Sequence, residues 1–477
     1  MPVSLTPERE ADFHFIWEQL HFDRGGLTTS CGKQLSIVHP GTLNTDQGPD
    51  FLQAKIELDG ILLCGHVELH LDGQDWYTHR HDRDPGYCPV ILHVVAQPSR
   101  RPPKRKDGTV IPELVLRERI HSGPLARIRA LRSQSKGLAC APWLVKQIPH
   151  LSHKEFEQYG KGRLLRKAEA FRKRMQGLRG DWEQIIWEAL ARSFGGPVNG
   201  ASFGELARAL PWKVLRSYLR VPGRRYLQRD AVTQRNQGAN ILREKHQAYG
   251  HFPATEVISE GSRESLEALL FGVAGLLEDQ LPKREPWPLR LRLEWSYLAR
   301  KHRLRAQAIP WLHHRMRPAS FPEVRLSQLA GFLLIFSDLA TLLVPSAWDR
   351  VLKSEVGTAR YWDTHSRLGK VAVPRKRALG ASVRERFILN GLAPLALLYG
   401  EWHGARWIPG AIPPEKLIFE VLRGMPPEDN RIVRLVQESH TRPQNALQAQ
   451  GALELYKMNC LQHNCLQCRI GRDIVGS

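Results

Sequence analysis

The chain has 477 residues, of which 42% are hydrophobic and 13 are tryptophan. This supply of apolar side chains excludes a wholly disordered chain, and the length predicts more than one domain. Lys and Arg number 69 against 48 Asp and Glu, so the formal net charge is +21. Such an excess indicates a polyanionic partner, most often nucleic acid, while a basic but otherwise ordinary soluble protein is the alternative.

Cysteine content and hydropathy both favour a cytoplasmic location. Seven cysteines, an odd number in a long chain, argue against a disulfide scaffold. The first residues carry Glu8, Glu10 and Asp12 where a signal peptide would be apolar. The longest uninterrupted apolar stretch, residues 329–336, is far shorter than the ~20 residues that a membrane span needs. We therefore expect a cytoplasmic protein with no membrane partner.

The N-terminal part carries first a helical and then a strand pattern. Apolar residues recur at helical spacing near the start, and alternation of apolar and polar residues follows. Asp59–Gly60 lies between two alternating stretches and predicts a two-residue hairpin turn. In chain order, the predicted elements are one helix and four strands, over residues 8–20, 51–58, 61–71, 90–96 and 110–116.

From about residue 125 onward the pattern becomes helical. The predicted helices cover residues 163–178, 182–194, 264–277, 289–302 and 326–343. The fold class expected is therefore α+β. Residues 1–125 would form an α/β core, and residues 126–477 a larger, basic, mainly helical domain that ends in a cysteine cluster.

Carboxylate and imidazole side chains are expected to meet at one end of the hairpin. Asp50 begins its first strand, and Glu68-Leu69-His70 lies near the end of the second. Converging carboxylates can hold Mg²⁺ or Mn²⁺, ions that polarise a phosphodiester and acidify a bound water. Asp50 and Glu68 are thus candidate metal ligands, and His70 is a candidate to orient or activate the water.

This arrangement resembles the PD-(D/E)xK nuclease superfamily, in which an Asp on one strand and Glu-x-Lys on the next bind metal and activate water. The resemblance implies a restriction-endonuclease-like core over residues 1–125, with Asp50, Glu68 and His70 at the catalytic positions. His70 stands where the superfamily has Lys. A neutral imidazole can accept a proton from water but lacks the constant positive charge of Lys.

The register of the hairpin sets a condition on this interpretation. A two-residue turn at Asp59–Gly60 pairs Asp50 with Leu69, so Asp50 and Glu68 would point to opposite faces of the sheet. The metal site therefore requires a bend or bulge between Asp50 and Ala54. The alternative is that Glu68 and His70 line a solvated face.

The segment after the hairpin adds His79, His81 and Asp84. In a nuclease these side chains would flank the scissile phosphate and are second-line catalytic candidates. A His-x-His pair also suits a transition metal, and Gly73 with His79 and His81 resembles the first half of a cupin motif, although the expected Glu is absent. The remaining alternative is a polar loop beside the strand at residues 90–96.

Three cysteines lie close together at the chain end. Cys460, Cys465 and Cys468 have the C-x4-C-x2-C spacing of a metal site, and thiolates suit Zn²⁺ or an iron–sulfur cluster such as [4Fe–4S]. Cys140 is the best candidate for the fourth ligand, while Cys31 and His463 remain alternatives. The alternative is that these cysteines bind no metal and are reduced thiols packed under a terminal helix.

Several basic segments are candidate nucleic-acid-binding surfaces. Lys and Arg neutralise phosphates, and binding of this kind depends strongly on salt. Solvated helix faces and ion pairs to acidic residues are the alternatives. A basic loop covers Arg100 to Lys106, and the candidates elsewhere are Arg163, Arg166, Lys167, Arg172, Lys173, Arg315 and Arg317.

Several segments together resemble an uncharacterised bacterial family, the domain-of-unknown-function 2851 family. They include NTDQGPDF, GHVELH, DWYTHRHDRDPGY, VILHVV, YWDTH and the terminal CLQHNCLQCRIG. The resemblance implies one architecture and places Cys140 at a family cysteine position. It implies no established activity.

The residues predict a metal-dependent nuclease that hydrolyses phosphodiester bonds in DNA or RNA. The first alternative is a catalytically degenerate nuclease fold that binds nucleic acid or acts as a scaffold. The second is a His-based metalloenzyme that acts on a small molecule through His70, His79 and His81.

Overall fold

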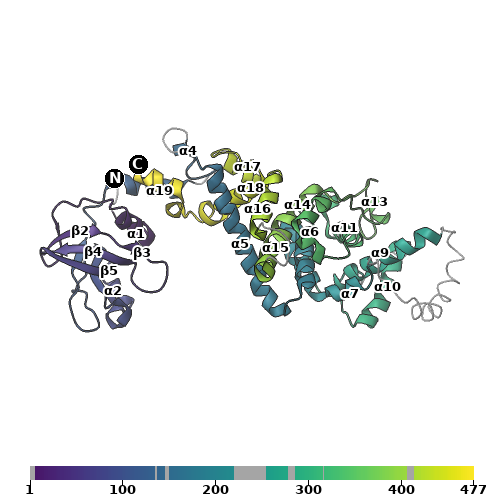
Figure 1. Ribbon diagram of the computed structural model, residues 1–477, viewed down its shortest axis with the longest axis horizontal. Coiled ribbons are helices and arrows are strands. Elements are labelled where there is room, and N and C mark those ends of the chain that lie inside the picture. Colours follow the sequence, from purple (N-terminus) through teal and green to yellow (C-terminus); the bar gives the residue numbers. More distant parts are fainter. Residues whose placement is uncertain are drawn as a thin grey trace. The chain divides into compact units, whose positions relative to one another are not determined.

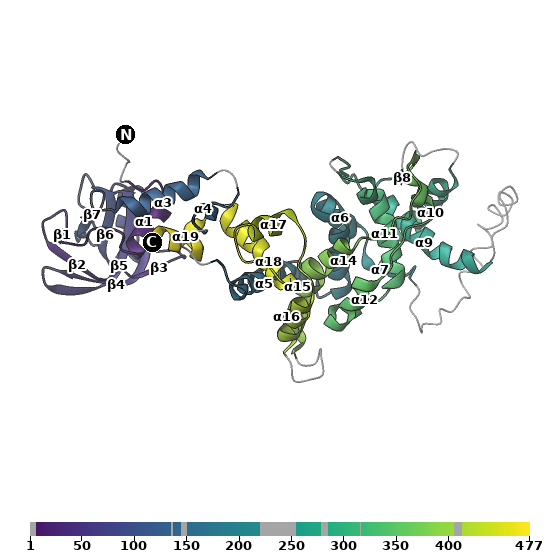
Figure 2. The same ribbon diagram turned by 90° about the horizontal axis from the view of Figure 1, so that it is seen from above.

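The computed structural model describes residues 6–134, 137–144, 150–219, 254–277, 285–314, 316–404 and 413–477 (Figures 1 and 2). It is a mixed α+β protein, as predicted. The chain forms two compact units. Unit 1 comprises residues 1–156, 429–443 and 452–477, and unit 2 comprises residues 157–428 and 444–451. Unit 2 is therefore inserted into unit 1, whereas the sequence had suggested a boundary after residue 125.

A mixed sheet forms the centre of unit 1. Its strand order is β1-β2-β4-β5-β6-β7, with β3 paired to β4. The pairs from β1 to β5 are antiparallel, and β5, β6 and β7 run parallel to one another. The strands are β1 Leu27–Thr28, β2 Gln34–His39, β3 Thr42–Leu43, β4 Phe51–Leu58, β5 Ile61–Asp72, β6 Val90–Gln97 and β7 Glu113–Val115.

The predicted hairpin is present as β4 and β5. Asp59 and Gly60 have φ values of 50° and 80°, the left-handed conformation that a two-residue turn requires. Ala54, Ile56 and Leu58 are buried on one face of β4, as their alternation predicted. The long strand β5 lies between β4 and β6, so both of its edges are paired.

The connection from β5 to β6 is built from very short helices. They are α2 Asp75–Thr78 and the 3-10 turns η1 His81–Arg83 and η2 Pro85–Tyr87. Arg80 adopts a left-handed conformation between α2 and η1, and Asp84 caps η2 by accepting a hydrogen bond from Gly86 N at 2.8 Å. These turns hold His79 and His81 beside β5.

Helices from both ends of the chain pack in unit 1. The predicted N-terminal helix is α1 Glu10–Glu18, and Phe13 and Trp17 on it belong to the apolar core of the sheet. Helix α3, Ser122–Ser133, is joined to α1 by an ion pair between Arg132 and Asp12. The remaining helices of unit 1 are α4 Ala141–Leu144, α17 Arg431–Gln437 and α19 Arg469–Gly476.

The C-terminal helix α19 lies against the N-terminal elements of unit 1 (Figure 2). Arg127 of α3 donates hydrogen bonds to the carbonyl of Val475 at 3.2 and 3.3 Å. Arg472 pairs with Glu18 of α1 at 3.0 Å. The last residues are therefore an integral part of unit 1.

Unit 2 is helical and has its own large apolar core. Helix α5 continues from unit 1 into unit 2, and α18 continues from unit 2 into unit 1. Within the described ranges, no helix is long and apolar enough to cross a membrane. The helices are α5 His153–Leu178, α6 Trp182–Ala209, α7 Trp212–Arg216, α9 Ala254–Val273, α10 Pro286–His302, α11 Pro322–Ile335, α12 Trp348–Lys353, α13 Tyr361–Thr364, α14 Ala381–Phe387, α15 Ala393–His403, α16 Pro414–Gly424 and α18 Ala446–Leu455, and a small hairpin joins β8 His365–Arg367 to β9 Lys370–Val371.

The predicted helices of unit 2 all overlap observed ones, but their ends differ. The helix predicted over residues 182–194 is the first part of α6, which is interrupted at Gly196, where φ is 62° and ψ is −156°, directly before Pro197. The helix predicted over residues 326–343 ends at Ile335, and the remainder forms the 3-10 turn η4, Ala340–Leu343. Glycine and proline thus divide α6 into two helical segments close to the predicted end.

We expect Gly272→Ala to lower the thermal unfolding midpoint of unit 2. A Cβ on Gly272 of α9 would lie 2.0 Å from Cδ2 of Trp295 on α10, and such overpacking costs about 1–3 kcal/mol. Calorimetry against Gly162→Ala provides the control, because a Cβ at Gly162 of α5 meets open space. Equal midpoints for the two variants would contradict the close packing of α9 on α10.

Candidate metal centre

A β-bulge brings Asp50 and Glu68 together. The β4–β5 register runs through Ala54 opposite Gly65 and then shifts, so that Phe51 lies opposite Val67. Gln53, with a φ of 56°, lies within the shift. The bulge that the metal interpretation required between Asp50 and Ala54 is therefore present.

The two carboxylates each bind the backbone of the opposite strand. Asp50 N donates to Glu68 Oε2 at 3.0 Å, and Leu69 N donates to Asp50 Oδ2 at 2.9 Å. The same Asp50 oxygen lies 3.2 Å from Nε2 of His14 on α1. These contacts fix the orientation of both carboxylates and leave Glu68 Oε1 directed at the neighbouring histidines.

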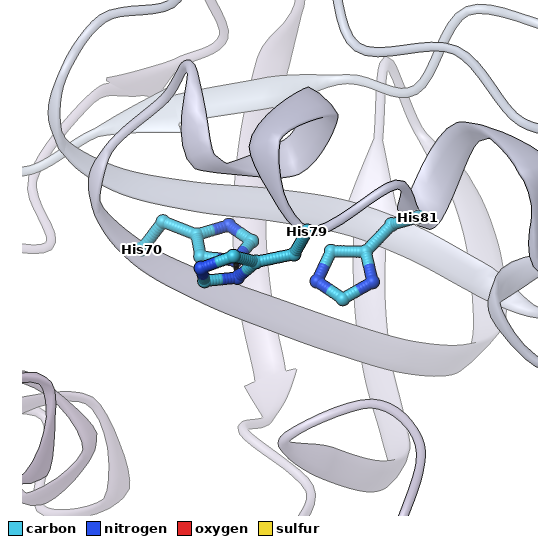
Figure 3. Close-up of side chains that lie close together, drawn as sticks. All are labelled: His70, His79 and His81. Atoms are coloured by element: carbon cyan, nitrogen blue, oxygen red, sulfur yellow. Dashed lines mark hydrogen bonds between the residues drawn. The ribbon is translucent and has the colours of Figure 1, made fainter.

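Three imidazoles, those of His70, His79 and His81, converge in unit 1 (Figure 3). His70 comes from β5, and His79 and His81 come from the connection that follows it. One nitrogen of each ring lies within 4.8 Å of the other two. Nε2 of His70 is 3.2 Å from Nδ1 of His79, and Glu68 Oε1 is 3.3 Å from Nε2 of His81 and 3.6 Å from Nε2 of His70.

These separations fit the coordination shell of a single transition-metal ion. Metal–nitrogen bonds of about 2.0–2.1 Å at tetrahedral angles place two ligand atoms about 3.3 Å apart. The nitrogens of His70, His79 and His81 lie within 4.8 Å of one another, and Glu68 Oε1 lies near two of them, His70 and His81. In the described structure the buried Nε2 of His81 makes no hydrogen bond, which an ion at this point would explain.

A chain of buried hydrogen bonds sets the tautomer of His70. Nδ1–H of His93 donates to Glu113 Oε2 at 3.2 Å, and Nδ1–H of His70 donates to Nε2 of His93 at 2.9 Å. Nε2 of His70 consequently carries a lone pair directed at His79 and His81. Ligand histidines in metal sites are oriented in this way by a carboxylate acting through the second ring nitrogen.

Glu113 is suited to end this chain as an ionised acceptor. Burial opposes its charge, but hydrogen bonds from His93 and from Ser99 outweigh burial and lower the pKa of Glu113. Its carboxylate also accepts hydrogen bonds from the hydroxyl of Ser99 and, at 3.3 Å, from that of Ser30. Hydrogen bonds from His93, Ser99 and Ser30 therefore fix the orientation of the Glu113 carboxylate.

The centre disfavours the charged forms of its ligands. Burial, followed by the nearby rings of His93, His81 and His79, lowers the pKa of His70 to about 2. Burial and His79 lower the pKa of His81 to about 4. Burial and the charge of Asp50 raise the pKa of Glu68 to about 9. Neutral imidazoles are the form that binds metal, and a cation would reverse the shift of Glu68.

Aromatic side chains form one wall of the centre. The ring of Tyr87 stacks on His81 with centroids 3.8 Å apart, and Trp76 is fully buried against His81 and His93. Trp76 Nε1 donates to the carbonyl of Lys104 at 2.9 Å. This wall fixes His81 and excludes water from its side of the cluster.

A basic loop is anchored on helix α2, next to His79. The Tyr77 hydroxyl donates to the carbonyl of Pro102 at 2.6 Å, and Arg101 lies over the Tyr77 ring at 3.6 Å. The side chains of Arg100, Lys104 and Lys106 on this loop are exposed. Three exposed basic side chains therefore lie on a loop that is tied to α2, the helix directly before His79.

Asp84, a second-line candidate, caps the η2 turn with its carboxylate and is not among the three clustered ligand residues. Three further residues were missed by sequence reasoning, namely His14, His93 and Glu113. His93 had a signal, since a histidine within an apolar strand buried on both faces must find a partner. No sequence pattern indicated His14 or Glu113, because their contacts depend on tertiary packing.

The basic candidates on α5 have different surroundings. Arg163 is buried and donates to Gln450 at 2.8 Å, and Lys167 donates to Gln450 and Asn390. Arg172 pairs with Glu169 and Glu401. These three groups are engaged within unit 2. The exposed members are Arg166, Lys173 and Arg317, and Arg315 lies outside the described residues.

The fold and the site define an α+β protein whose sheet carries a buried histidine–carboxylate centre. Residues 10–224 and 246–431 match the family described as Protein of unknown function (DUF2851), and the chain belongs to this family. No curated protein and no solved structure matches the chain.

We expect Glu113→Gln to weaken transition-metal binding about 10- to 100-fold, because the amide no longer fixes the tautomer of His93 and, through it, that of His70. Competition with a metal-sensitive chelator measures the affinity. Glu57→Gln, at an exposed position of β4, is the control. An unchanged affinity in folded Glu113→Gln protein would show that the buried hydrogen-bond chain does not act on the centre.

Proposed function

We propose that the protein is a metal-dependent hydrolase of phosphodiester bonds in nucleic acid. The observation that carries the proposal is the convergence of His70, His79 and His81 within 4.8 Å, with Glu68 Oε1 beside two of them, His70 and His81. Three histidines would leave room on one ion for Glu68, for water and for a phosphate oxygen. Such an ion acidifies the water and polarises the phosphate.

The donor set favours a transition metal over Mg²⁺. Imidazole suits zinc, copper, iron or nickel, whereas Mg²⁺ and Mn²⁺ prefer oxygen ligands. In place of the Mg²⁺ or Mn²⁺ expected at Asp50 and Glu68, the histidines therefore favour an ion such as zinc or iron. Asp50 takes the role of orienting Glu68 and accepting a contact from His14.

Charge supports a polyanionic substrate. The chain carries a net charge of +21, and the exposed side chains of Arg100, Lys104 and Lys106 lie on the loop anchored beside His79. Arg166, Lys173 and Arg317 extend the list of exposed basic candidates. Phosphates would be attracted to this loop and held with a strong dependence on salt.

We expect His79→Ala and Glu68→Gln to lower metal-dependent cleavage at least about a hundredfold, because each removes a ligand. The assay uses labelled single- and double-stranded DNA and RNA with Mn²⁺, Zn²⁺, Fe²⁺, Ni²⁺ or Mg²⁺. His314→Ala, at an exposed histidine of unit 2, is the control. Metal bound at the histidines without cleavage of any nucleic acid would favour a metalloenzyme acting on a small molecule, and absence of metal binding would overturn the centre.

We expect the double variant Lys104→Ala and Lys106→Ala to weaken nucleic-acid binding and to reduce its salt dependence. Each lost phosphate contact lowers the slope of log affinity against log salt by about 0.9 for duplex DNA. Binding titrations across a salt series measure the slope. Lys353→Ala, which removes a lysine paired with Asp349 at 2.8 Å, provides the comparison. An unchanged slope would remove the loop from the binding surface.

A further inference from the structure

Four cysteines gather in unit 1 apart from the histidine centre. Cys460 ends a π-helical turn, Cys465 begins a 3-10 turn, and Cys468 directly precedes α19. Cys140 directly precedes α4, on the other side of unit 2 in the sequence. All four are free thiols.

The backbone around the three C-terminal cysteines is a tightly hydrogen-bonded loop. His463 N donates to the carbonyl of Cys460 at 3.2 Å, and Cys468 N donates to that of Cys465 at 3.0 Å. His463 has a φ of 53°, which turns the chain back. A Cβ on Gly471 would lie 2.1 Å from the carbonyl oxygen of Cys465, so glycine is required where α19 packs on this loop.

The four sulfurs influence one another electrostatically. Burial, followed by the charges of Cys468 and Cys465, raises the pKa of Cys140 to about 12. Burial and the charge of Cys140 raise the pKa of Cys460. Contacts link the two segments as well: Cys140 Sγ lies 3.7 Å from Nε2 of His440, and the His440 ring lies 6.3 Å from that of His150. The carbonyl of His150 accepts a hydrogen bond at 3.3 Å from Arg469, which directly follows Cys468, so Cys140 lies in the same region of unit 1 as the C-terminal loop.

The spacing is wider than one zinc ion requires. Zinc–sulfur bonds of about 2.3 Å place two sulfurs on one ion no more than about 4.6 Å apart. Among the described residues, the histidine trio is a group of ligand atoms within 4.8 Å, and the cysteine sulfurs form no such group. A [4Fe–4S] cluster binds each of its four cysteine sulfurs to a different iron, so it does not require the sulfurs to lie this close together.

We propose that Cys140, Cys460, Cys465 and Cys468 ligate a [4Fe–4S] cluster, each thiol giving up its proton and binding one iron. Two neighbouring groups suit a negatively charged cluster. His440 is buried and its Nε2 lies 3.7 Å from Cys140 Sγ, within reach of a hydrogen bond to sulfur. Arg132 lies close enough to Cys465 for its charge to favour the thiolate.

The cluster would have a structural role in unit 1. It joins Cys140, before the chain enters unit 2, to the segment that follows the return from unit 2. Helix α19 begins directly after Cys468 and packs on α3. Closing such a long loop by a covalent link reduces the entropy of the unfolded chain, as a long-range disulfide does.

The test is chemical analysis of the full chain purified without oxygen. We expect about four iron atoms and four acid-labile sulfides per chain, with a broad visible absorption that reducing agent bleaches. One zinc per chain without sulfide would overturn the cluster. So would protein that holds neither metal after anaerobic reconstitution with ferrous iron and sulfide.

Variants assign the ligands and separate this proposal from the histidine centre. Cys140→Ser and Cys468→Ser should lose sulfide and visible absorption, whereas Cys88→Ser, at an exposed cysteine, should retain both. His79→Ala should also retain both, because iron at the histidines carries no sulfide. Full sulfide content in Cys140→Ser would overturn the ligand set, and the wild-type analysis stands even where a variant fails to fold.

Discussion

The shift of register within β4 is the constraint on which the rest of the site depends. Side chains of a strand alternate between faces, so a one-residue slip reverses which ones meet across a hairpin. The apolar face of β4 needs the regular pairing through Ala54, while Asp50 must lie opposite Glu68. The bulge at Gln53 satisfies both requirements, because it changes the pairing only between Ala54 and Phe51, at the start of the strand.

The burial of Glu68 and His70 explains why the side chains around them are fixed by hydrogen bonds. Glu68 and His70 lie on the central strand β5 and are 4% and 2% exposed, so each lone pair or proton without a partner would be costly. The hydrogen bonds from Glu113 through His93 to His70 satisfy one side of the cluster. On the opposite side, Glu68 Oε1 and ring nitrogens of His70, His79 and His81 lie close together, where a shared proton or a cation can link them.

Local patterns predicted the hairpin, its turn and the need for a bulge, because strand alternation and the Asp59–Gly60 turn are encoded within a few residues. They also predicted Asp50, Glu68, His70, His79 and His81, which lie close in sequence. The insertion of unit 2 into unit 1 could not be predicted, since it depends on contacts between segments far apart. The role of Glu113 could not be predicted for the same reason, because Glu113 contacts His93 from a different strand.

The two proposed metal sites differ in donor chemistry, and this difference keeps their metals apart. Imidazole and carboxylate at short spacing suit one borderline ion, whereas widely spaced thiolates suit an iron–sulfur core. The first site is built on adjacent strands and needs no contribution from residues after unit 2. The second forms only when the chain has returned from unit 2 to unit 1. Loss of the cluster should therefore affect the closure of unit 1 before it affects the geometry of the histidines.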